Sequence, residues 1–412
     1  MLRLPVYFRI CLRNVLRQRR RTAIALSAIG FGVVALLIAG GFIGWILDEM
    51  RELSIRTYYG HVQVARAGYW DDAASDPYAF LVRGTPPAVA RLAKDPRVAT
   101  VAPRLSFAGL VSHGDNTLSF LGEAVDPALE AAFGRSLIFM PGRGANLAPG
   151  DAKGVVVGQG LAANLGVKTG DTVVLLVNTP KGGVNAVELT IRGVFLTVNK
   201  AFDDATLRLP LATAQSLLRT DGVQSWTVLL KRSGDLDDVQ DNFRADTAKD
   251  KLELRPWTAL ADTYLRTEAL FGRQLGAMAL VLALLIVLGI SNTMTMSVLE
   301  RTSEIGTAMA LGATRRDVLA QFVIEGVVLG LLGAAAGTVV GIALAALLSW
   351  IGIPLPPPPG LDTRIIAEIR VGPGLAVSAF LTAAASTVVA SLYPALRASR
   401  LVIVDALRTA RI

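Results

Sequence analysis

The sequence is poor in the residues on which catalytic sites and disulfide frameworks depend. Its 412 residues include one cysteine and two histidines, and charged residues make up 18%. A single cysteine, Cys11, excludes a disulfide within the chain. Two histidines, His61 and His113, exclude a zinc site with several histidine ligands. A hydrolase with a histidine-dependent triad has no further support.

Phosphate-binding loops are missing as well. The sequence has no G-x-x-x-x-G-K-[ST] loop and no G-x-G-x-x-G between an expected strand and helix. Asp71, Asp72 and Asp76 lack the spacing of an EF-hand and are expected to form a solvated turn. We therefore expect no catalytic residue, no metal site and no cofactor in this chain. Any ATP and Mg²⁺ would be bound by a partner subunit.

What the chain has in excess is apolar residues. Hydrophobic residues make up 52% of the sequence, and the mean hydropathy is +0.49. Both values exceed those of a soluble domain. Spanning a membrane takes about 20 apolar residues, and four runs are long enough: residues 22–47, 274–299, 318–350 and 371–396. We predict a polytopic α-helical membrane protein whose first run is a retained helix and not a removed signal peptide.

Basic residues predict the orientation, because short loops rich in lysine and arginine stay in the cytoplasm. An arm, residues 1–21, precedes the first run, and a tail, residues 397–412, follows the last. Their arginines include Arg9, Arg13, Arg17, Arg19, Arg20, Arg21, Arg397, Arg400, Arg408 and Arg411. Both termini are therefore predicted to be cytoplasmic, with residues 48–273 and 351–370 outside. These arms also explain the net charge of +8 through contact with lipid headgroups, so we expect no nucleic-acid partner.

The external segment, residues 48–273, alternates between strand and helix patterns. Helical patterns at residues 83–94, 160–165 and 211–218 make it a mixed α+β domain with one large or two small cores. Residues 48–57 and 258–273 are expected to continue the first two membrane helices outward as a stalk. Short runs bounded by turn residues are expected strands: residues 61–64, 118–121, 154–157, 172–177, 187–194 and 226–230.

The segment between the second and third runs, residues 300–317, is the most informative stretch. It combines helix formers with charges of both signs. Ile305, Ala308, Met309 and Gly312 are spaced to share one face of a helix, and Gly312-Ala313 is a natural helix end. Such an apolar stripe usually contacts a partner protein, although a helix lying on the membrane surface is the alternative.

Glycines recur every four residues in two of the runs. They are Gly40 and Gly44 in the first run and Gly333, Gly337 and Gly341 in the third. Such ridges allow helices to approach closely, either within the subunit or across a dimer.

A single carboxylate, Glu325, lies well inside a run. We expect it near the cytoplasmic interface, where it would cap the helix or pair with Arg315 or Arg316. Residues 354–359 are expected to form a stiff extended connector.

Several motifs together resemble the FtsX-like permease superfamily, the membrane subunits of MacB-type and lipoprotein-releasing (LolC/LolE-type) ABC transporters. The most specific is E-I-G-x-x-x-A-x-G-A at residues 304–313, followed by the long apolar helix with Glu325. The resemblance covers nearly the whole chain, and G-H-V-Q-V at residues 60–64 is closer to the lipoprotein-releasing branch. Further matches are V-D-P at residues 125–127, V-G-x-G-L-A at 157–162, L-G-V-x-x-G-D at 165–171, Y-P-A-L-R-A at 393–398 and D-A-L-R at 405–408.

The resemblance implies four membrane helices with a MacB-like periplasmic domain between the first two, in the bacterial inner membrane. It also implies a second permease subunit, identical or paralogous, and two copies of a separate ABC ATPase. ATP-driven dimerisation of the ATPases would push on residues 300–317, which we call the coupling segment, and the second span would act as a lever. Glu304, Arg315 and Arg316 would supply polar contacts at the edge of the coupling segment. The expected coupling residues are Glu304, Ile305, Gly306, Ala308, Met309, Gly312, Ala313, Arg315 and Arg316.

The resemblance favours extraction or export of a lipidated or amphipathic substrate, with lipoprotein release as the most specific form. By position alone, a substrate groove would lie between the first span of one subunit and the second span of its partner. Its expected lining is Phe42, Trp45, Ile46, Phe271 and Met278. Two alternatives stay open: control of a periplasmic cell-wall hydrolase without transport, and efflux of peptides or macrolides through an adaptor and an outer-membrane duct.

Overall fold

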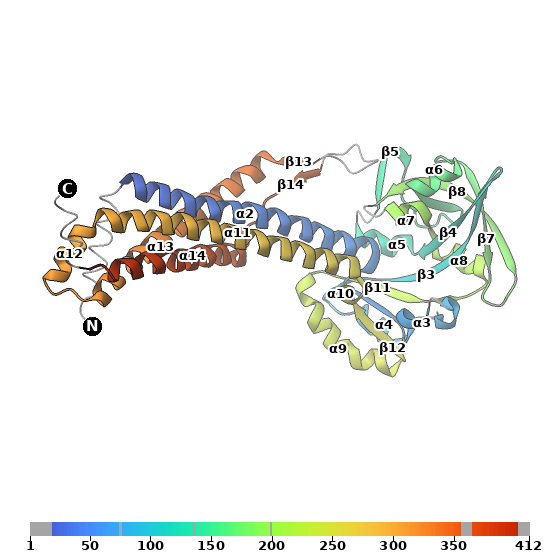
Figure 1. The fold of residues 1–412 in the computed structure, drawn as a ribbon. Helices are drawn as coiled ribbons and strands as arrows, with labels where there is room; N and C mark the ends of the chain where they lie inside the picture. The colour runs from blue at the N-terminus through green and yellow to red at the C-terminus, as the bar shows by residue number, and fades with distance from the viewer. Residues whose placement is uncertain (1–18, 74–75, 135–136, 198–199, 356–364, 403–412) are drawn as a thin grey trace. The chain divides into compact units, whose positions relative to one another are not determined.

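The structure is a computed structural model that describes residues 19–73, 76–134, 137–197, 200–355 and 365–402 (Figure 1). It divides into two compact units: residues 1–48, 267–356 and 364–412 form the first, and residues 49–266 and 357–363 form the second. Most of the predicted basic arm with Cys11, the connector from residue 356 onward, and the tail beyond residue 402 lie outside the described residues.

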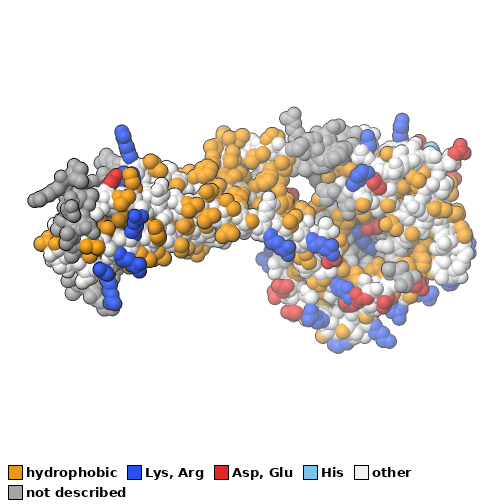
Figure 2. Space-filling view, in the orientation of Figure 1, with side chains coloured by type: hydrophobic (Ala, Val, Ile, Leu, Met, Phe, Trp, Pro, Cys, Tyr) orange, Lys and Arg blue, Asp and Glu red, His pale blue; other side chains and the backbone are white. Residues whose placement is uncertain are grey.

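Four helices of the described chain are long and apolar enough to cross a membrane. They are α2 (Arg19–Ser54), α11 (Asp262–Glu300), α13 (Arg315–Ile351) and α14 (Pro373–Ser399). Their facing sides form one apolar core that includes Ile29, Phe322 and Ala383. Figure 2 shows hydrophobic side chains along these helices. In the most apolar stretch of α11 only 11% of the residues are buried, against 33–39% in the other three helices.

Short elements join the membrane helices. Helix α12 (Thr302–Ala310) lies between α11 and α13. Strands β13 (Ile353–Leu355) and β14 (Ile365–Ala367) pair antiparallel between α13 and α14. The start of the expected extended connector is therefore a strand with a partner.

The main sheet of the second unit closes on itself. Its strands are β3 (Val98–His113), β4 (Asn116–Val125), β9 (Thr206–Pro210), β6 (Gly154–Gly158), β8 (Val184–Leu196) and β7 (Thr172–Asn178), in that spatial order. Strand β7 pairs with both β8 and β3, which completes a ring. The alternation along β7 puts Val173, Leu175 and Val177 inside the ring and their neighbours outside. We call this ring the barrel.

A smaller lobe continues the sheet beyond β3. Strands β11 (Ser225–Leu230), β1 (Val62–Arg66) and β12 (Leu252–Pro256) follow β3 in order. Helices α4 (Pro87–Leu92) and α9 (Leu236–Lys249) contribute to its core, which includes Val64, Leu92 and Val239. The second unit therefore has two principal cores, one inside the barrel and one in this lobe.

The remaining elements of the second unit are short. They are η1 (Ile55–Tyr59), α3 (Tyr69–Asp72), η2 (Pro77–Phe80), β2 (Val82–Arg83), α5 (Pro127–Glu130), η3 (Ala131–Phe133), β5 (Ile138–Gly144), α6 (Gln159–Leu165), α7 (Lys200–Ala205), α8 (Leu211–Leu218), β10 (Gly222–Val223), η4 (Ser233–Asp235) and α10 (Trp257–Leu260).

The predicted fold class is confirmed: four candidate membrane helices accompany a mixed α+β domain. Each expected strand overlaps an observed one. The helix expected over residues 83–94 is wrong in extent, because Val82–Arg83 is a strand and α4 covers only Pro87–Leu92. Gly84 has a φ of 68° and Pro87 occupies the first turn, so the helix starts there.

Candidate functional site

The coupling segment is a short helix with a well-defined end. After α12 the N–H of Gly312 donates to the carbonyl of Met309, and the N–H of Ala313 donates to that of Ala308. With a φ of 103° at Gly312 this is a Schellman motif. Thr314 and Asp317 then form a capping box that starts α13. The helix end expected at Gly312-Ala313 is therefore present.

The apolar stripe of this helix does not face outward as a whole. Ile305 is buried in the core of the membrane helices and Met309 packs against the same core. The chain's own helices cover Ile305, whereas Met309 keeps part of its surface exposed. The expected contact of these two residues with a partner stays a prediction. On the other side Ala308 and Gly312 are exposed, and Leu311 is 85% exposed.

Arg301 ties this helix to α13. Its Nε lies 3.3 Å from a Glu304 oxygen, and its Nη1 donates to a Glu325 oxygen at 3.3 Å. Its guanidinium carbon also lies 5.7 Å from the centroid of the Phe322 ring. The partner expected for Glu325 was Arg315 or Arg316, and this is wrong because both are exposed at the start of α13 while Arg301 reaches the buried carboxylate.

Glu300, the residue before Arg301 in the sequence, forms a second ion pair. Arg21, at the start of α2, makes two hydrogen bonds through both terminal nitrogens to the carboxylate of Glu300, the last residue of α11. Sequence analysis missed both Arg301 and this pair. A buried Glu325 signals that a cation must lie nearby, but spacing alone did not indicate which one.

The glycine ridge of α13 packs against α2. A Cβ on Gly337 would lie 2.8 Å from the Cα of Gly30, and one on Gly333 would lie 2.9 Å from Ile29. Gly341 faces Leu37 in the same way. The sequence left open whether this ridge packs within the subunit or across a dimer, and in the structure it packs within the subunit.

The glycines of α2 have other neighbours. A Cβ on Gly40 would lie 2.7 Å from Leu375 of α14, and one on Gly44 would lie 4.0 Å from the carbonyl oxygen of Arg370. The glycine of α2 that opposes the α13 ridge is Gly30, which has no glycine four residues away and so gave no ridge signal.

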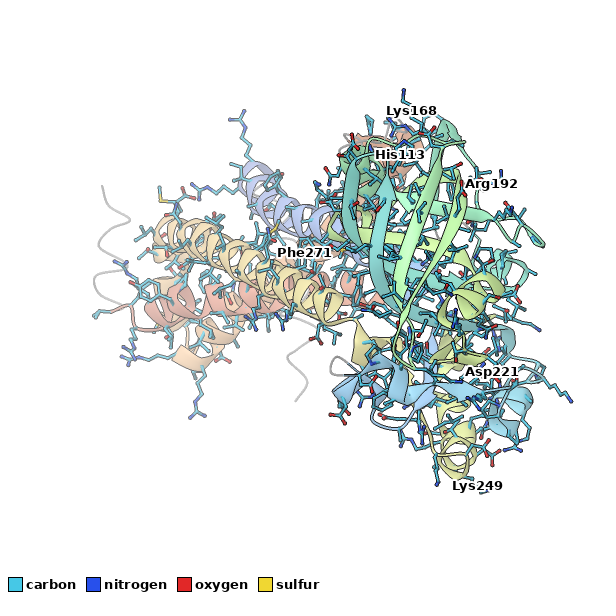
Figure 3. All side chains as sticks on the ribbon, turned by 90° about the vertical axis from the view of Figure 1, so that its right-hand side faces the viewer. His113, Lys168, Arg192, Asp221, Lys249 and Phe271 are labelled. Carbon is cyan, nitrogen blue, oxygen red and sulfur yellow. The ribbon has the colours of Figure 1, made fainter. Side chains whose placement is uncertain are left out.

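The residues expected to line a substrate groove differ in exposure. Trp45 is only 6% exposed and stacks on Phe42, with ring centroids 6.1 Å apart. Phe42, Ile46, Phe271 and Met278 are half-buried. Phe271 is labelled on α11 in Figure 3.

The end of the α2 helical segment is held inside the second unit by buried polar contacts. After Ser54 the chain forms one turn of π-helix, η1, and Gly60 donates to the carbonyl of Ile55. The carbonyl of Thr57 in this turn accepts a hydrogen bond from Arg208 at 2.9 Å. The Tyr58 hydroxyl donates to Thr197 Oγ1 at 2.9 Å. π-Turns are rare and frequently mark functional sites, and we call η1 with these contacts the joint.

Arg208 belongs to a buried ion network of the barrel. Its Nε lies 2.7 Å from Glu123, whose carboxylate also faces Arg104 at 3.7 Å. Arg104 in turn pairs with Glu130 at 3.0 Å. Burial alone would raise the pKa of Glu123, but the charges of Arg208 and Arg104 outweigh it and hold this pKa below its usual value.

The other stalk segment is held by aromatic contacts to the smaller lobe. The ring of Trp257 lies 5.0 Å from that of Tyr264 in α11, and the backbone N–H of Trp257 donates to the backbone carbonyl of His61. The Nδ1 of His61 accepts from the N–H of Leu230, so its Nε2 carries the hydrogen and faces Ser233 at 2.9 Å. Burial lowers the pKa of His61, and the residue is a structural group in this position.

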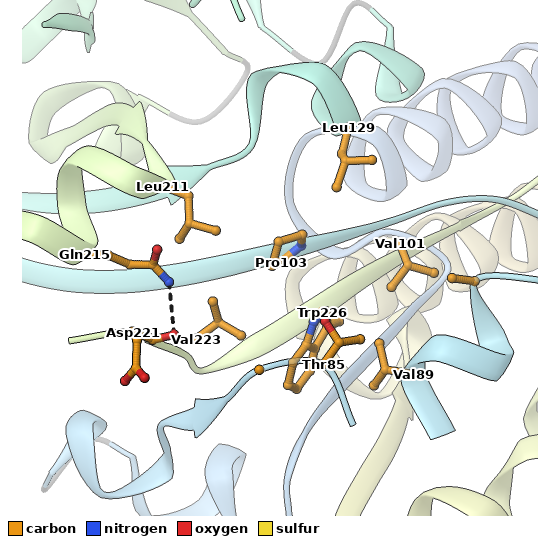
Figure 4. A pocket seen from close by; sticks show the side chains of 12 residues that line it. Thr85, Val89, Val101, Pro103, Leu129, Leu211, Gln215, Asp221, Val223 and Trp226 are labelled. Atoms are coloured by element: carbon orange, nitrogen blue, oxygen red, sulfur yellow. Dashed lines mark hydrogen bonds between the residues drawn. The ribbon is translucent and has the colours of Figure 1, made fainter. Parts of the chain in front are cut away.

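A cavity of about 300 Å³ lies where the two cores of the second unit meet (Figure 4). Val89 and Trp226 come from the smaller lobe, and Leu211 and Gln215 come from α8 beside the barrel. Gln215 donates to the carbonyl of Asp221 at the rim. The lining is mainly apolar.

The described residues contain no group of three or more histidine, cysteine or acidic side chains placed to hold a metal ion. Of the acidic residues in the expected turn, Asp71 pairs with Arg255 at 2.8 Å and Asp76 accepts from the N–H of Tyr78. The expected turn therefore contains an ion pair and a helix cap.

Four candidate membrane helices, a short helix between the second and third, and a closed α+β domain after the first define a multi-pass membrane protein. Residues 22–246 match the family described as MacB-like periplasmic core domain, and residues 276–403 match the FtsX-like permease C-terminal family. The chain belongs to this family of MacB-type ABC transporter permeases, as the motifs of the sequence indicated.

Relatives cover different parts of the chain. "Macrolide export ATP-binding/permease protein MacB" of Brucella abortus is 32% identical over 205 residues, 48% of this chain and 29% of its own length. The protein of the same name from Burkholderia lata is 26% identical over 95% of this chain and 55% of its own length. "Pyoverdine export ATP-binding/permease protein PvdT" of Pseudomonas fluorescens is 34% identical over 40% and 23%. This chain thus spans less than two thirds of each of these relatives.

Among solved structures, the periplasmic region of MacB from Actinobacillus actinomycetemcomitans aligns with a TM-score of 0.37 and 14% identity. The alignment covers 51% of this chain and 94% of that region.

Proposed function

We propose that this chain carries movement from a separate ATPase, present in two copies, to its external domain. The observation that supports this most directly is the double attachment of α12. Ile305 is buried in the membrane core, and Arg301 bridges Glu304 and Glu325. A force on the exposed Leu311 would therefore move the helix bundle instead of bending a loop.

ATP and Mg²⁺ would be bound by the partner ATPase, since these 412 residues contain no Walker-type loop, and this chain would contribute no catalytic residue. The contact with the ATPase would use the exposed side of the coupling segment, with Glu304, Ala308, Leu311 and Gly312, and the exposed Arg315 and Arg316. This face is smaller than the set of coupling residues expected from sequence.

We propose the bacterial inner membrane as the location, with both termini in the cytoplasm and the second unit in the periplasm. The basic residues before α2 and after α14 support this orientation. The family description of residues 22–246 as a periplasmic core domain agrees with it.

Within the second unit the movement would pass from α2 through the joint. Arg208 and Tyr58 link the π-turn to the barrel, whereas Trp257 links α11 to the smaller lobe. A displacement of one helix relative to the other would therefore act on two different lobes. The cavity lined by Val89, Trp226 and Leu211 lies at their boundary and would change shape.

The cargo we propose is a lipidated or amphipathic molecule taken from the outer leaflet, with release of a lipoprotein as the most specific form. A second permease subunit would complete the groove lined by Phe42, Ile46, Phe271 and Met278, and Trp45 would support it from behind. The exposed apolar surface of α11, with Leu280 at 72%, is available for this subunit or for lipid.

Efflux of a small molecule through an adaptor and an outer-membrane duct is the second candidate. Relatives named as exporters of macrolides and of pyoverdine favour it.

The test of coupling is replacement of Leu311 with aspartate, followed by purification of the tagged chain from its own membranes and mass spectrometry of co-purifying proteins. We expect the ATPase to be lost from Leu311→Asp. The ATPase should still co-purify with Leu121→Asp, a matched change at a leucine of the external barrel that is 58% exposed. Retention of the ATPase by Leu311→Asp would overturn the proposed contact.

The same purification of the unchanged protein separates the proposed cargoes. A lipoprotein or acylated ligand in the sample supports extraction from the membrane. An adaptor protein without lipidated cargo supports efflux, and a soluble cell-wall hydrolase or its activator in place of both would argue for a signalling role.

A further inference from the structure

The external domain contains a second cavity that the coupling proposal does not use. It has a volume of about 580 Å³ and lies in the second unit beside α6. Its walls come from β5 with Arg143, from α6 with Gln159 and Ala162, from the loop after α6 with Lys168, and from β8 with Val194. A cavity of this size accommodates a small molecule.

Two positive charges line this cavity without a carboxylate partner. Among the described residues, neither Arg143 nor Lys168 forms an ion pair, whereas Arg192 and Arg208 of the same domain both do. Asp171, the nearest acidic residue along the chain, accepts the backbone N–H of Lys168 at 2.7 Å. Figure 3 shows the Lys168 side chain at the surface of the domain. The positive charge of the cavity is therefore available to an anion.

The remaining wall is apolar. Ala162, Val167 and Val194 are each buried, with at most 7% of their surface exposed. They offer a surface for a short hydrocarbon group and contribute no charge of either sign.

We propose that this cavity binds a small amphipathic anion. Arg143 and Lys168 would hold its phosphate or carboxylate, and Ala162, Val167 and Val194 would contact its apolar part. The headgroup of an acidic phospholipid and a free phosphate ester share this chemistry. The proposal does not depend on coupling to an ATPase.

The test uses the full chain in nanodiscs of phosphatidylcholine and isothermal titration calorimetry with 1-hexanoylglycerol 3-phosphate. This probe has a phosphate, a free hydroxyl and a short acyl chain. We expect saturable binding to one site per chain and no binding of neutral 1-hexanoylglycerol. Equal binding of the two probes, or no saturable binding of the phosphate, would overturn the proposal.

Three variants locate the site. The double variant Arg143→Gln/Lys168→Gln should weaken binding by about tenfold or more, because each lost charged hydrogen bond has an effect of that size. The control Lys94→Gln/Lys181→Gln removes the same charge from exposed positions elsewhere in the domain and should keep the wild-type affinity. Ala163→Leu fills the cavity, keeps both cations and should also weaken binding.

Melting temperatures show that each variant is folded. A matching loss of affinity in the control double variant, or unchanged binding by Ala163→Leu, would contradict the assignment. Nanodiscs that contain phosphatidylglycerol distinguish the sources. Competition with the probe identifies a lipid headgroup as the ligand, and undiminished binding identifies a free anion.

Discussion

The guanidinium group of Arg301 lies 3.3 Å from the carboxylate of Glu325, which joins the residue before the coupling helix to the interior of α13. Both side chains are largely buried, with 15% and 7% exposed. Removing one partner of a buried pair leaves the other charge without compensation, whereas replacing both avoids this cost. The pair therefore fixes where α12 sits relative to the membrane helices.

We expect Arg301→Gln to lower the free energy of unfolding by about 3 kcal/mol, because Glu325 loses its cation. The double variant Arg301→Gln/Glu325→Gln should recover part of this loss. Thermal unfolding of the purified chain in one detergent measures both. Arg316→Gln, at an exposed position, is the control and should change stability by less than about 0.5 kcal/mol. Equal destabilisation by Arg301→Gln and Arg316→Gln would show that the pair contributes nothing.

The contact between α13 and α2 predicts a sharp difference between two glycines. Gly337→Leu places a side chain against Gly30 and Val33, where even a Cβ would lie within 2.9 Å of both, so the helices must separate. Gly289→Leu in α11 adds the same side chain where, apart from the neighbouring backbone of α11 itself, no atom of the described chain lies within 4 Å of a Cβ.

We expect Gly337→Leu to reduce the yield and melting temperature of the folded protein, at a cost of about 1–3 kcal/mol. Gly289→Leu should leave the melting temperature of the isolated chain nearly unchanged. If it lowers the yield of a permease dimer while the monomer stays folded, a neighbouring subunit covers that position. Equal effects of the two changes on monomer stability would contradict the packing described.

The Glu123 carboxylate predicts a dependence of stability on pH. Its pKa in the folded protein is below its usual value, so the stabilisation it gives is complete above the unfolded pKa of about 4.3. This stabilisation is lost as the pH falls through the folded pKa. Glu123→Gln should therefore destabilise the protein by on the order of 3 kcal/mol at pH 7, because Arg208 loses its partner.

Urea unfolding at a series of pH values from 7 to 3.5 measures this dependence. The difference between wild type and Glu123→Gln should shrink toward the acid end. A difference that stays constant over the whole range would mean that Glu123 does not titrate with folding. Glu188→Gln, at an exposed position of β8, serves as the control.

The contacts of the joint predict a variant that stays folded but transmits less movement to the external domain. Tyr58→Phe removes the hydroxyl that donates to Thr197 and keeps the ring that packs at 5.0 Å from Phe202. Loss of one hydrogen bond costs about 1 kcal/mol, so the protein should stay folded. With the partner ATPase reconstituted, we expect ATP hydrolysis to continue while cargo release falls severalfold.

Thr213→Val is the matched control, because it also removes one hydrogen bond from the same domain but lies on α8, away from the joint. It should leave release unchanged. A proportional fall of hydrolysis and release in Tyr58→Phe would point to a general loss of stability instead of a loss of transmission.

The membrane helices could be predicted from sequence because long apolar runs are stable only inside a hydrocarbon layer or a core. The alternation of β7 likewise follows from local pattern. Closure of the barrel does not, since it depends on β7 pairing with β3. Strand β3 begins at Val98, 74 residues before the start of β7 at Thr172, and contains Pro103 and Gly109. These two residues interrupt the strand pattern, and β3 was not predicted.

The contacts of the candidate site could likewise be predicted only in part from the sequence. Helical spacing correctly grouped Ile305 with Met309, but periodicity indicates only which residues share a face and not which element covers it. The partner of Glu325 lies 24 residues earlier, at Arg301, between α11 and α12. Arg208 and Thr57 are 151 residues apart, and no local signal joins them. Contacts of this kind are set by tertiary packing.

Closure of the barrel by β7 also determines at which edges a further strand could pair with the sheet. The strands of the ring have neighbours on both sides, so unpaired backbone edges within the described sheet are confined to β12 and β5. Strand β12 has five residues, includes the charged Glu253 and Arg255 and ends at Pro256. Strand β5 has an irregular register between Phe139 and Gly144. Short, charged, proline-containing or irregular edges discourage strand addition, so the domain is protected against edge-to-edge aggregation when it is displayed at high density on a membrane.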